Sequence, residues 1–243
     1  MSVVFDRVVV EAQGSRLLGP VSVSLTQRRI AVLGENGSGK STFLKAAAGL
    51  IGPQYGSVRV AGHDTIDDET DVRRVVGFCF AEADAQLLAG TVGEDIELSV
   101  RVAKGRNYPQ TTAEKVLQDF GLSLSTQRAC HTLSGGQKQA LALASVLTAQ
   151  PTIIVCDEPT TRLDLRWRRD MIDVLCALQQ QLIIATHDLD FAVLCDRVLV
   201  IDDGLIVFDG NPEAGVAMYE QLCDSRPSRI PRGCAAQQVR DEA

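Results

Sequence analysis

The fold of this chain is decided by the stretch Gly34-Glu35-Asn36-Gly37-Ser38-Gly39-Lys40-Ser41-Thr42. It matches the phosphate-loop pattern G-x-x-x-x-G-K-[ST]. An apolar run at 30–33 precedes it and a helical pattern at 43–50 follows it, which is the order of elements that the motif requires. The glycines let the backbone curl so that successive N–H groups face one centre, and the positive end of the following helix points there too.

This loop is built to hold the phosphates of a nucleotide. Lys40 would reach the β- and γ-phosphates, and the Ser41 hydroxyl would be a ligand of Mg²⁺. We therefore predict an ATP site at residues 34–42, with Mg²⁺ beside it. The alternative is a Gly-rich turn that matches by chance, which the strand and helix patterns on either side disfavour.

Composition restricts the class of protein. With 243 residues, 45% of them hydrophobic, the chain can bury one large core. A formal charge of -7 argues against a nucleic-acid partner, because binding a phosphate backbone needs a concentrated excess of Lys and Arg. The seven cysteines include no C-x-x-C pair, which favours reduced thiols in the cytosol. The sequence shows no signal peptide and no apolar run long enough to span a bilayer, so any membrane association would have to come through partners.

Apolar runs alternate with helical patterns through most of the chain. Polar–apolar alternation over residues 3–30 predicts antiparallel strands. The continuous apolar runs 152–156 and 182–186 predict a parallel sheet covered on both faces. Asp157 and Glu158 follow the first run and His187 follows the second, at the strand ends where such sheets bind ligands.

Helical spacing dominates the middle of the chain. Apolar residues recur every three or four positions over 92–102 and 112–121, which predicts amphipathic helices of an inserted subdomain at about 82–145. The segment Leu133-Ser134-Gly135-Gly136-Gln137 opens a further helix. Ser134 is a candidate cap for it, so this helix start offers a second anion site. A hairpin at 197–208 follows, and the composition of residues 224–243 predicts a disordered tail.

Taken together, the motifs at 34–42, 133–139, 153–158 and 160–164 and His187 resemble the ATP-binding subunit of an ABC transporter. The resemblance implies an α/β P-loop ABC ATPase over residues 1–223, with a mostly parallel sheet core, an N-terminal antiparallel β subdomain and an inserted helical subdomain. It also implies a head-to-tail pair of ATPase subunits. Each ATP would lie between the phosphate loop of one subunit and segment 133–137 of the other.

The same resemblance assigns roles to single residues. Asp157 would hold the Mg²⁺ shell together with Ser41, and Glu158 would polarise the attacking water, as a carboxylate beside bound metal and phosphate can. His187 would contact the γ-phosphate, which makes it catalytic alongside Glu158 and Lys40. Asp164 would lie in the loop that communicates between the two sites. We expect Trp167 to pack in the protein rather than stack on the nucleotide.

Two positions depart from the family pattern. Ala81 stands where the family has a Gln that can touch both Mg²⁺ and the attacking water. Two alternatives follow: coupling between transporter movement and hydrolysis is weaker, or it uses Glu82 or Gln86. No aromatic residue occurs at 11–13, where the family stacks a ring on adenine. We expect the loss of that stack to weaken ATP affinity by roughly 1 kcal/mol.

Shorter phrases at 71–80, 84–87 and 91–96 are similar to the energy-coupling-factor (ECF) importers of vitamins and of cobalt or nickel ions, and residues 26–30 are most like the biotin branch. That similarity implies three kinds of partner: a second ATPase subunit, identical or different; a membrane coupling subunit; and a small substrate-binding membrane subunit. The chain would lie peripherally on the cytoplasmic face of the cell membrane. Region 81–95 would receive the coupling subunit, and we expect charge reversal at Glu94 or Asp95 to weaken that assembly alone.

Other classes of protein remain open. A soluble ABC ATPase, for example in iron–sulfur assembly, shares the same motifs. A regulatory protein that binds ATP without hydrolysing it would fit the changes at Ala81 and 11–13, although Glu158 and His187 argue for turnover. The transported substrate, the direction of transport and the role of the tail are open as well.

Overall fold

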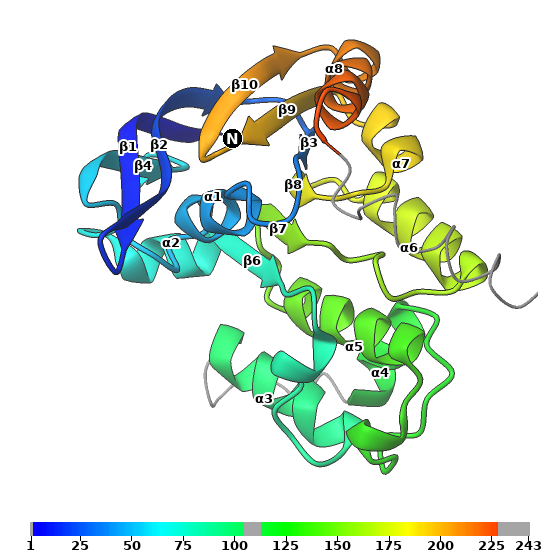
Figure 1. The fold of residues 1–243 in the computed structure, drawn as a ribbon. Helices are drawn as coiled ribbons and strands as arrows, with labels where there is room; N and C mark the ends of the chain where they lie inside the picture. The colour runs from blue at the N-terminus through cyan, green and yellow to red at the C-terminus, as the bar shows by residue number, and fades with distance from the viewer. Residues whose placement is uncertain (1, 105–112, 228–243) are drawn as a thin grey trace, which may run out of the picture.

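The computed structural model describes residues 2–104 and 113–227. Its centre is a six-stranded sheet in the order β10-β9-β3-β8-β7-β6 (Figure 1). Neighbouring strands are parallel except β10, which forms an antiparallel hairpin with β9. The strands are β3 (Arg29–Leu33), β6 (Val76–Cys79), β7 (Ile153–Asp157), β8 (Gln181–Ala185), β9 (Arg197–Asp202) and β10 (Leu205–Gly210).

A four-stranded antiparallel sheet packs beside it, in the order β2-β1-β4-β5. Helix α1 (Lys40–Ala47) lies between the two sheets (Figure 1). Phe43 of this helix stacks on Phe5 with ring centroids 4.5 Å apart, inside one apolar core shared by both sheets. The strands of the second sheet are β1 (Val3–Ala12), β2 (Ser15–Leu25), β4 (Tyr55–Val60) and β5 (His63–Asp64).

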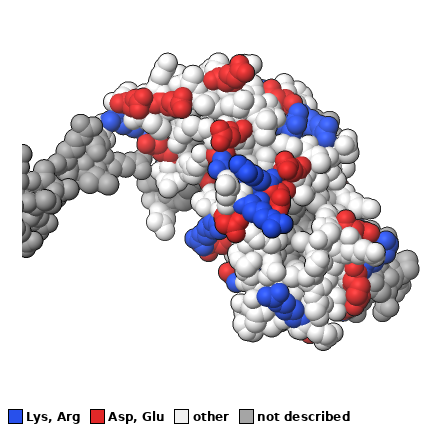
Figure 2. All heavy atoms as spheres, turned by 90° about the vertical axis from the view of Figure 1, so that its right-hand side faces the viewer, with Lys and Arg blue, Asp and Glu red and all other residues white. Residues whose placement is uncertain are grey.

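The other face of the six-stranded sheet is covered by four helices that share a second apolar core. They are α5 (Gly135–Thr148), α6 (Leu165–Ala177), α7 (Leu189–Val193) and α8 (Pro212–Asp224). On the side of the molecule that carries α6, α7 and α8, basic and acidic side chains are interspersed (Figure 2). Arg168, for example, pairs with both Asp188 and Asp190 there. The described part of this face therefore presents mixed charge rather than one basic patch.

A third apolar cluster belongs to the helical part of the chain. Helix α3 (Val92–Lys104) and helix α4 (Ala113–Asp119) pack with α5, and short 3₁₀ turns lie at η1 (Ala83–Ala85) and η2 (Cys130–Thr132). The amphipathic spacing explains this packing, because Val92, Ile96 and Val100 lie on one face of α3 and are all buried. Helix α5 contributes to both clusters, so it joins this part to the sheet.

The predicted α/β architecture is confirmed, with differences at the ends of elements. The helix after the phosphate loop begins at Lys40 rather than at 43, because Gly39 ends the loop. Arg74, predicted to open the strand at 74–80, lies in the last turn of α2 (Glu69–Val75). Asp224, predicted to begin a disordered tail, is instead the last residue of α8, and Arg226, just beyond the helix, pairs with Asp202. Residues 228–243 lie outside the described part.

Candidate ATP site

The phosphate loop connects β3 to α1, and its backbone requires glycine at two points. Gly39 has φ 108°, and a Cβ there would lie 2.8 Å from the carbonyl oxygen of Leu17. Gly34 has φ 153°, and a Cβ there would lie 2.3 Å from the carbonyl oxygen of Ile201. Any side chain at either position would collide with the backbone of β2 or β9, so the loop can be this compact only with glycine.

Lys40 opens α1 and turns back into the loop. Its side chain is 6% exposed, and its Nζ donates to the carbonyl oxygens of Gly34 (2.8 Å) and Glu35 (3.0 Å). Burial lowers the pKa of Lys40, while the negative charges of Glu158, Asp157 and Glu35 oppose that change. The loop thus holds the largely desolvated ammonium group of Lys40 among carbonyl oxygens. From this position the ammonium group can turn to phosphate oxygens.

The parallel register of the sheet brings together Asp157 at the end of β7, Glu158 directly after it and His187 after β8. Asp157 pairs with Ala185 across β7 and β8, so both strands end at the same edge of the sheet. Glu158 follows with φ 52°, and its N–H donates to the carbonyl oxygen of Ala185 (3.0 Å). A non-glycine residue in the left-handed region is uncommon, and here it turns the carboxylate out of the strand direction.

Glu158 is held by three side chains. His187 Nε2 lies 2.9 Å from Glu158 Oε1, and Thr161 Oγ1 donates to Glu158 Oε2 at 2.6 Å. Lys40 Nζ is 3.9 Å from Oε1. His187 Nε2 also lies 2.9 Å from Asn36 Oδ1, so this nitrogen faces two acceptors and carries the proton. Burial lowers the pKa of His187, and the charge of Glu158 opposes the shift without cancelling it.

The structure therefore brings together Lys40, Glu158 and His187, the three residues predicted to be catalytic. Thr161 is a further member that sequence reasoning missed. Its only signal is its position three residues after Glu158, and nothing in the motif distinguishes it from Thr160. Asn36 was predicted as part of the phosphate loop, but its contact with His187 arises only from the tertiary fold.

Two buried polar atoms in this part of the molecule have no hydrogen-bond partner among the described residues: Oδ1 of Asp157 and Oγ of Ser38. Asp157 is 8% exposed and Ser38 is 6% exposed. A buried carboxylate oxygen without a donor is costly unless a cation or water completes it. Asp157 is thus suited to a metal shell, and carboxylate and hydroxyl oxygens are the donors that Mg²⁺ prefers.

Segment 133–137 forms the start of α5. Ser134 caps the helix: its Oγ accepts from the Gln137 N–H (3.3 Å), and Gln137 Oε1 accepts from the Ser134 N–H (3.1 Å). The predicted cap is therefore present as a reciprocal capping box. Gly136 lies against the Trp167 ring, where an added Cβ would come within 2.3 Å. This contact confirms that Trp167 packs in the protein, and it explains why segment 133–137 needs a glycine there.

Asp164 acts as the N-cap of α6, because its Oδ1 accepts from the N–H groups of Arg166 (3.0 Å) and Trp167 (2.9 Å). Two residues of the loop 160–164 therefore make separate contacts. Thr161 contacts Glu158, and Asp164 caps α6 through the N–H group of Trp167. A role for Asp164 between two sites stays a prediction.

The residues around Ala81 are engaged elsewhere. Gln86 donates to the carbonyl oxygen of Ala142 (3.1 Å) and accepts from the Phe80 N–H (3.2 Å), so its side chain is occupied by backbone. Glu82 accepts from Arg162 at 2.7 Å. Of the two residues considered as substitutes for the missing Gln, only Glu82 therefore contacts the loop that carries Thr161.

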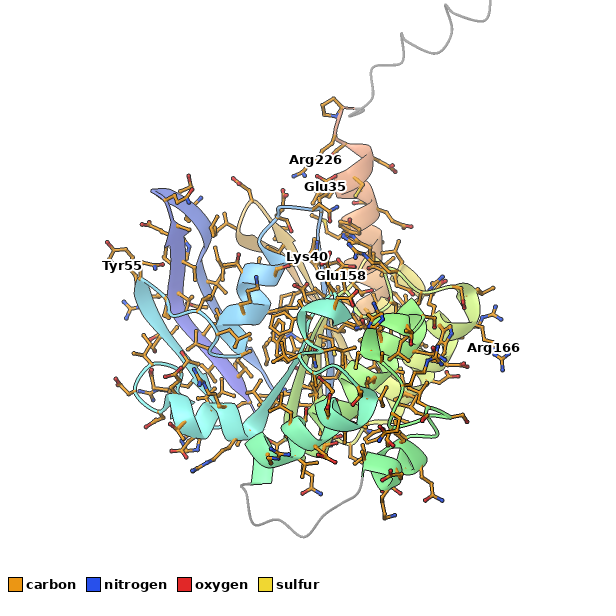
Figure 3. All side chains as sticks on the ribbon, turned by 90° about the horizontal axis from the view of Figure 1, so that it is seen from below. Glu35, Lys40, Tyr55, Glu158, Arg166 and Arg226 are labelled. Atoms are coloured by element: carbon orange, nitrogen blue, oxygen red, sulfur yellow. The ribbon has the colours of Figure 1, made fainter. Side chains whose placement is uncertain are left out.

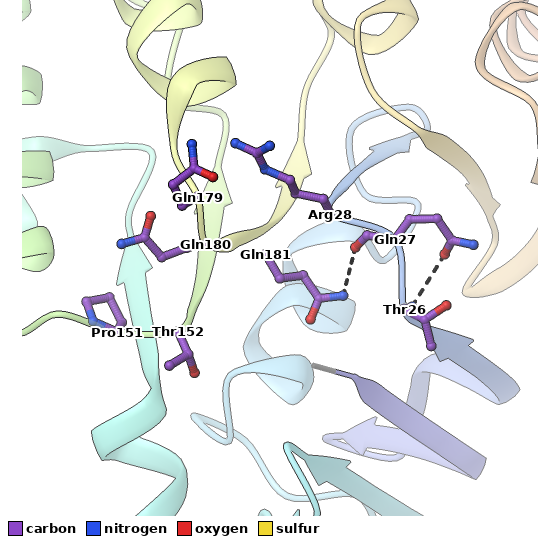
Figure 4. Close-up of a pocket in the computed structure, with 8 residues that line it drawn as sticks. All are labelled: Thr26, Gln27, Arg28, Pro151, Thr152, Gln179, Gln180 and Gln181. Carbon is purple, nitrogen blue, oxygen red and sulfur yellow. Dashed lines mark hydrogen bonds between the residues drawn. The ribbon is translucent and has the colours of Figure 1, made fainter.

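Another hollow lies at the opposite, amino end of the parallel strands (Figure 4). It has a volume of about 440 Å³, and Gln27, Arg28 and Gln181 contribute to its walls. Arg28 Nε donates to the carbonyl oxygen of Leu178 (3.0 Å), and Gln181 Nε2 donates to the carbonyl oxygens of Leu25 and Gln27. The polar groups of this hollow thus form hydrogen bonds between neighbouring strands and loops. We therefore assign the ATP site to the carboxyl end of the strands alone.

Comparison with known proteins agrees with this geometry. The ABC transporter family model matches residues 18–161, which include the phosphate loop, segment 133–137 and the end of β7. The biotin transport ATP-binding protein BioM of Rhizobium etli is 36% identical over 91% of this chain and 99% of its own length. The energy-coupling factor transporter ATP-binding protein EcfA1 of Latilactobacillus sakei is 34% identical over 87% of this chain and 79% of its own length.

Solved structures show the same fold. The cbiO1 protein of Clostridium perfringens, part of the ABC transporter complex cbiONQ, superposes with a TM-score of 0.75 at 26% identity, over 91% of this chain and 93% of that one. A dimeric ATP-binding cassette in a post-hydrolysis state, bound to ADP and Pi, has a TM-score of 0.75 at 25% identity, over 86% of this chain and 98% of that one. The chain therefore belongs to the ABC transporter family, as an ATP-binding subunit that hydrolyses ATP to drive transport.

Proposed function

We propose that this chain is the ATPase of an ECF-type importer, which drives uptake of a vitamin or a transition-metal ion through membrane subunits. The observation that carries the proposal is the similarity to BioM over nearly the whole length of that protein, together with the similarity to EcfA1. Biotin is the first substrate to test. This chain would never touch the substrate, because its polar cluster at the carboxyl end of the sheet is built for phosphates.

The site suggests a division of roles in hydrolysis. Loop 34–39 and Lys40 hold the phosphates of ATP. Glu158 orients the attacking water and accepts its proton, with Thr161 fixing the carboxylate. The Nε2–H of His187, which donates to Asn36 and Glu158 in the protein alone, turns to an oxygen of the γ-phosphate when ATP is present.

Mg²⁺ fits the same site. Ser41 and Asp157 would hold it, and Asp157 Oδ1, which has no donor within residues 2–104 and 113–227, supports this assignment. When bound, Mg²⁺ would neutralise charge on the phosphate oxygens.

We further propose that two ATPase subunits enclose each ATP. Within one chain, Gly135 and Gly136 lie beside Arg162 and Trp167. The capped start of α5 therefore leaves backbone N–H groups for a ligand that another subunit brings. The dimeric cassette bound to ADP and Pi supports such a pairing. The partner would be a second copy of this chain or a related ATPase.

A groove between the sheet and the helical part would receive the membrane coupling subunit. It has a volume of about 740 Å³ and is lined by residues of α2, α3 and α5. Two large apolar side chains are exposed in it, Leu88 (76%) and Leu98 (39%). Exposed apolar side chains in a concave surface favour a protein partner. No helix among residues 2–104 and 113–227 is long and apolar enough to cross a bilayer, and we propose a peripheral position on the cytoplasmic face of the membrane.

The structure corrects the expected effect of charge reversal at the rim of this groove. Asp95 is 3% exposed and accepts hydrogen bonds from the N–H groups of Leu88 (2.9 Å) and Ala89 (3.2 Å). Glu94 exchanges hydrogen bonds with Thr91 at the start of α3. Reversing either charge would disrupt the loop itself, so a selective effect on docking is not expected there.

Affinity capture of the tagged chain from detergent-solubilised membranes of its own cells tests the proposal. Recovery of a coupling membrane protein together with a small substrate-binding membrane protein, identified by mass spectrometry, would support it. Uptake of biotin, cobalt or nickel by the reconstituted complex would then identify the substrate. Recovery of soluble partners alone would overturn the importer assignment and favour a soluble ABC ATPase, such as one in iron–sulfur assembly.

A further inference from the structure

We propose that Arg226, just beyond the end of α8, is a positioning residue of the phosphate loop that neutralises Glu35 and thereby sets the affinity for ATP. One guanidinium nitrogen of Arg226 pairs with the carboxylate of Glu35, and the other lies 2.5 Å from Asp202 Oδ1. Figure 3 shows Arg226 and Glu35 side by side at the end of α8, with Lys40 and Glu158 deeper in the same site.

The pairing is sheltered from solvent. The side chains of Glu35 and Asp202 are 18% and 20% exposed, and that of Arg226 is 36% exposed. A planar guanidinium that bridges two carboxylates is also more ordered than a lysine would be. Such a pair is screened less by salt than the surface ion pairs of α2 and α3, whose side chains are mostly exposed. The hydrogen bonds to Asp202 and Glu35 raise the pKa of Arg226.

Glu35 needs this cation because of its position. It is the second residue of the phosphate loop, and its carbonyl oxygen accepts from Lys40 Nζ at 3.0 Å. The site already contains Asp157 and Glu158, and ATP adds further negative charge. Without Arg226, Glu35 would have one cationic partner fewer, so its carboxylate would repel the phosphates more strongly and compete more for Lys40, whose charge it already influences.

Asp202 connects the same arginine to the other side of the loop. It ends β9, and the turn after it approaches the phosphate loop: the Gly204 N–H donates to the carbonyl oxygen of Ser38 at 2.8 Å. Arg226 therefore joins Glu35, at the start of the loop, to the strand end whose turn holds Ser38. Both sides of the anion-binding backbone are held by a residue that lies 191 positions after Glu35.

An alternative to this proposal is that Arg226 only anchors the end of α8. The two roles predict different effects on the unfolding temperature and on the affinity for ATP. An anchor would affect unfolding temperature and leave the affinity for ATP alone. A neutralising residue would change affinity through charge, so removing the Glu35 charge should compensate for removing Arg226.

The test compares Arg226→Gln, Arg226→Lys, Glu35→Gln and the double variant Glu35→Gln/Arg226→Gln in the full chain. Arg101→Gln is the matched control, since it removes one arginine from an exposed ion pair with Glu97 on α3, far from the site (Figure 1). The dissociation constant of ATP is measured by titration with a fluorescent ATP analogue at low and high salt. KM, kcat and the unfolding temperature are recorded alongside.

We expect Arg226→Gln to raise the dissociation constant of ATP and KM by about three- to tenfold at low salt. This is the effect on binding expected from one partly screened charge near a phosphate. High salt should shrink the effect, kcat should stay within about twofold, and Arg226→Lys should lie between the two. The double variant should return to within about twofold of the parent chain, and Arg101→Gln should leave affinity unchanged.

Two outcomes would overturn the proposal: a lower unfolding temperature with unchanged affinity in Arg226→Gln, or a double variant that binds ATP as weakly as Arg226→Gln. If Arg226→Gln does not fold, Glu35→Gln decides. That variant should bind ATP at least as tightly as the parent chain, because it leaves Arg226 with one acid fewer. Weaker binding in Glu35→Gln would refute the idea. A parent chain that fails to bind ATP would instead count against the ATPase assignment.

Discussion

His187 Nε2 lies 2.9 Å from Glu158 Oε1, although the two residues follow different strands and are 29 positions apart. The same nitrogen lies 2.9 Å from Asn36 Oδ1 of the phosphate loop. One imidazole thus connects the end of β7, the end of β8 and the nucleotide loop. A change in the charge or position of this ring therefore alters the contacts of both the Glu158 carboxylate and the phosphate loop.

The first prediction concerns pH. Burial lowers the pKa of folded His187 below its usual value near 6.5, so below pH 6.5 the unfolded chain takes up this proton more readily than the folded one. His187 therefore contributes stability that is present above pH 6.5 and is lost as pH falls below that value and through the lower pKa of the folded histidine. We expect the unfolding temperature to fall less between pH 7.5 and pH 5.5 in His187→Gln than in the parent chain. Equal losses in the two chains would contradict this.

The second prediction concerns the carboxylate. Glu158→Gln keeps the shape of the side chain but cannot accept a proton from water, so kcat should fall by at least about a hundredfold while ATP still binds. With ATP bound and hydrolysis blocked, we expect a closed dimer that gel filtration resolves from the monomer. A monomer-sized peak at saturating ATP would count against the pairing of two subunits. Glu220→Gln, on α8, serves as a control for the loss of one carboxylate.

The third prediction concerns Lys40. Replacement by Ala removes a basic side chain whose Nζ lies among the loop carbonyls, and it leaves Glu158 without that neighbour. We expect the dissociation constant of ATP to rise by about tenfold or more, because a charge-assisted contact to phosphate is lost. Titration with a fluorescent ATP analogue measures it. Lys45→Ala, in the last turn of α1, controls for the loss of a lysine from the same helix.

The fourth prediction tests Thr161 as a positioning residue. Thr161→Val keeps the shape and removes the hydroxyl that donates to Glu158 Oε2. We expect kcat to fall by about three- to tenfold with KM unchanged, since the carboxylate loses one hydrogen bond while the phosphate loop is intact. Thr161→Ser retains the hydroxyl and should recover most of the activity. A Thr161→Ser variant as slow as Thr161→Val would indicate a packing role instead.

The fifth prediction concerns the groove. Leu88→Asp places a charge on an apolar side chain that is 76% exposed, so it should fold normally and lose capture of the membrane subunits. ATP hydrolysis by the isolated chain should stay within about twofold of the parent. Leu194→Asp, on an apolar side chain 51% exposed after α7, is the control and should still capture them. Equal capture by both variants would remove Leu88 from the docking surface.

Local patterns were sufficient for the elements that carry the chemistry. The phosphate loop could be predicted because its spacing of glycines and Lys40 reflects backbone geometry within nine residues. The cap of α5 could be predicted as well, because Ser134 and Gln137 interact within one helical turn. The apolar runs at β7 and β8 predicted a parallel sheet, since strands buried on both faces have no polar alternation.

Contacts between distant parts of the chain needed the tertiary structure. Whether His187 reaches Glu158 depends on the register of β7 against β8, which no local pattern states. The end of α8 at Asp224 and the pairing of Arg226 with Glu35 depend on how that helix packs on the sheet, so composition alone could predict neither. The burial of Asp95 was missed for the same reason, because its partners lie in a loop and on α5.

By itself, the sequence determined the phosphate-loop motif at 34–42 and predicted that its residues hold a nucleotide's phosphates, because that information resides in short-range backbone geometry. Only the tertiary structure decided how Glu158, His187, Thr161 and Arg226 are held around the loop. Their contacts close over separations of up to 191 residues, and such contacts form through the packing of the whole sheet and its helices.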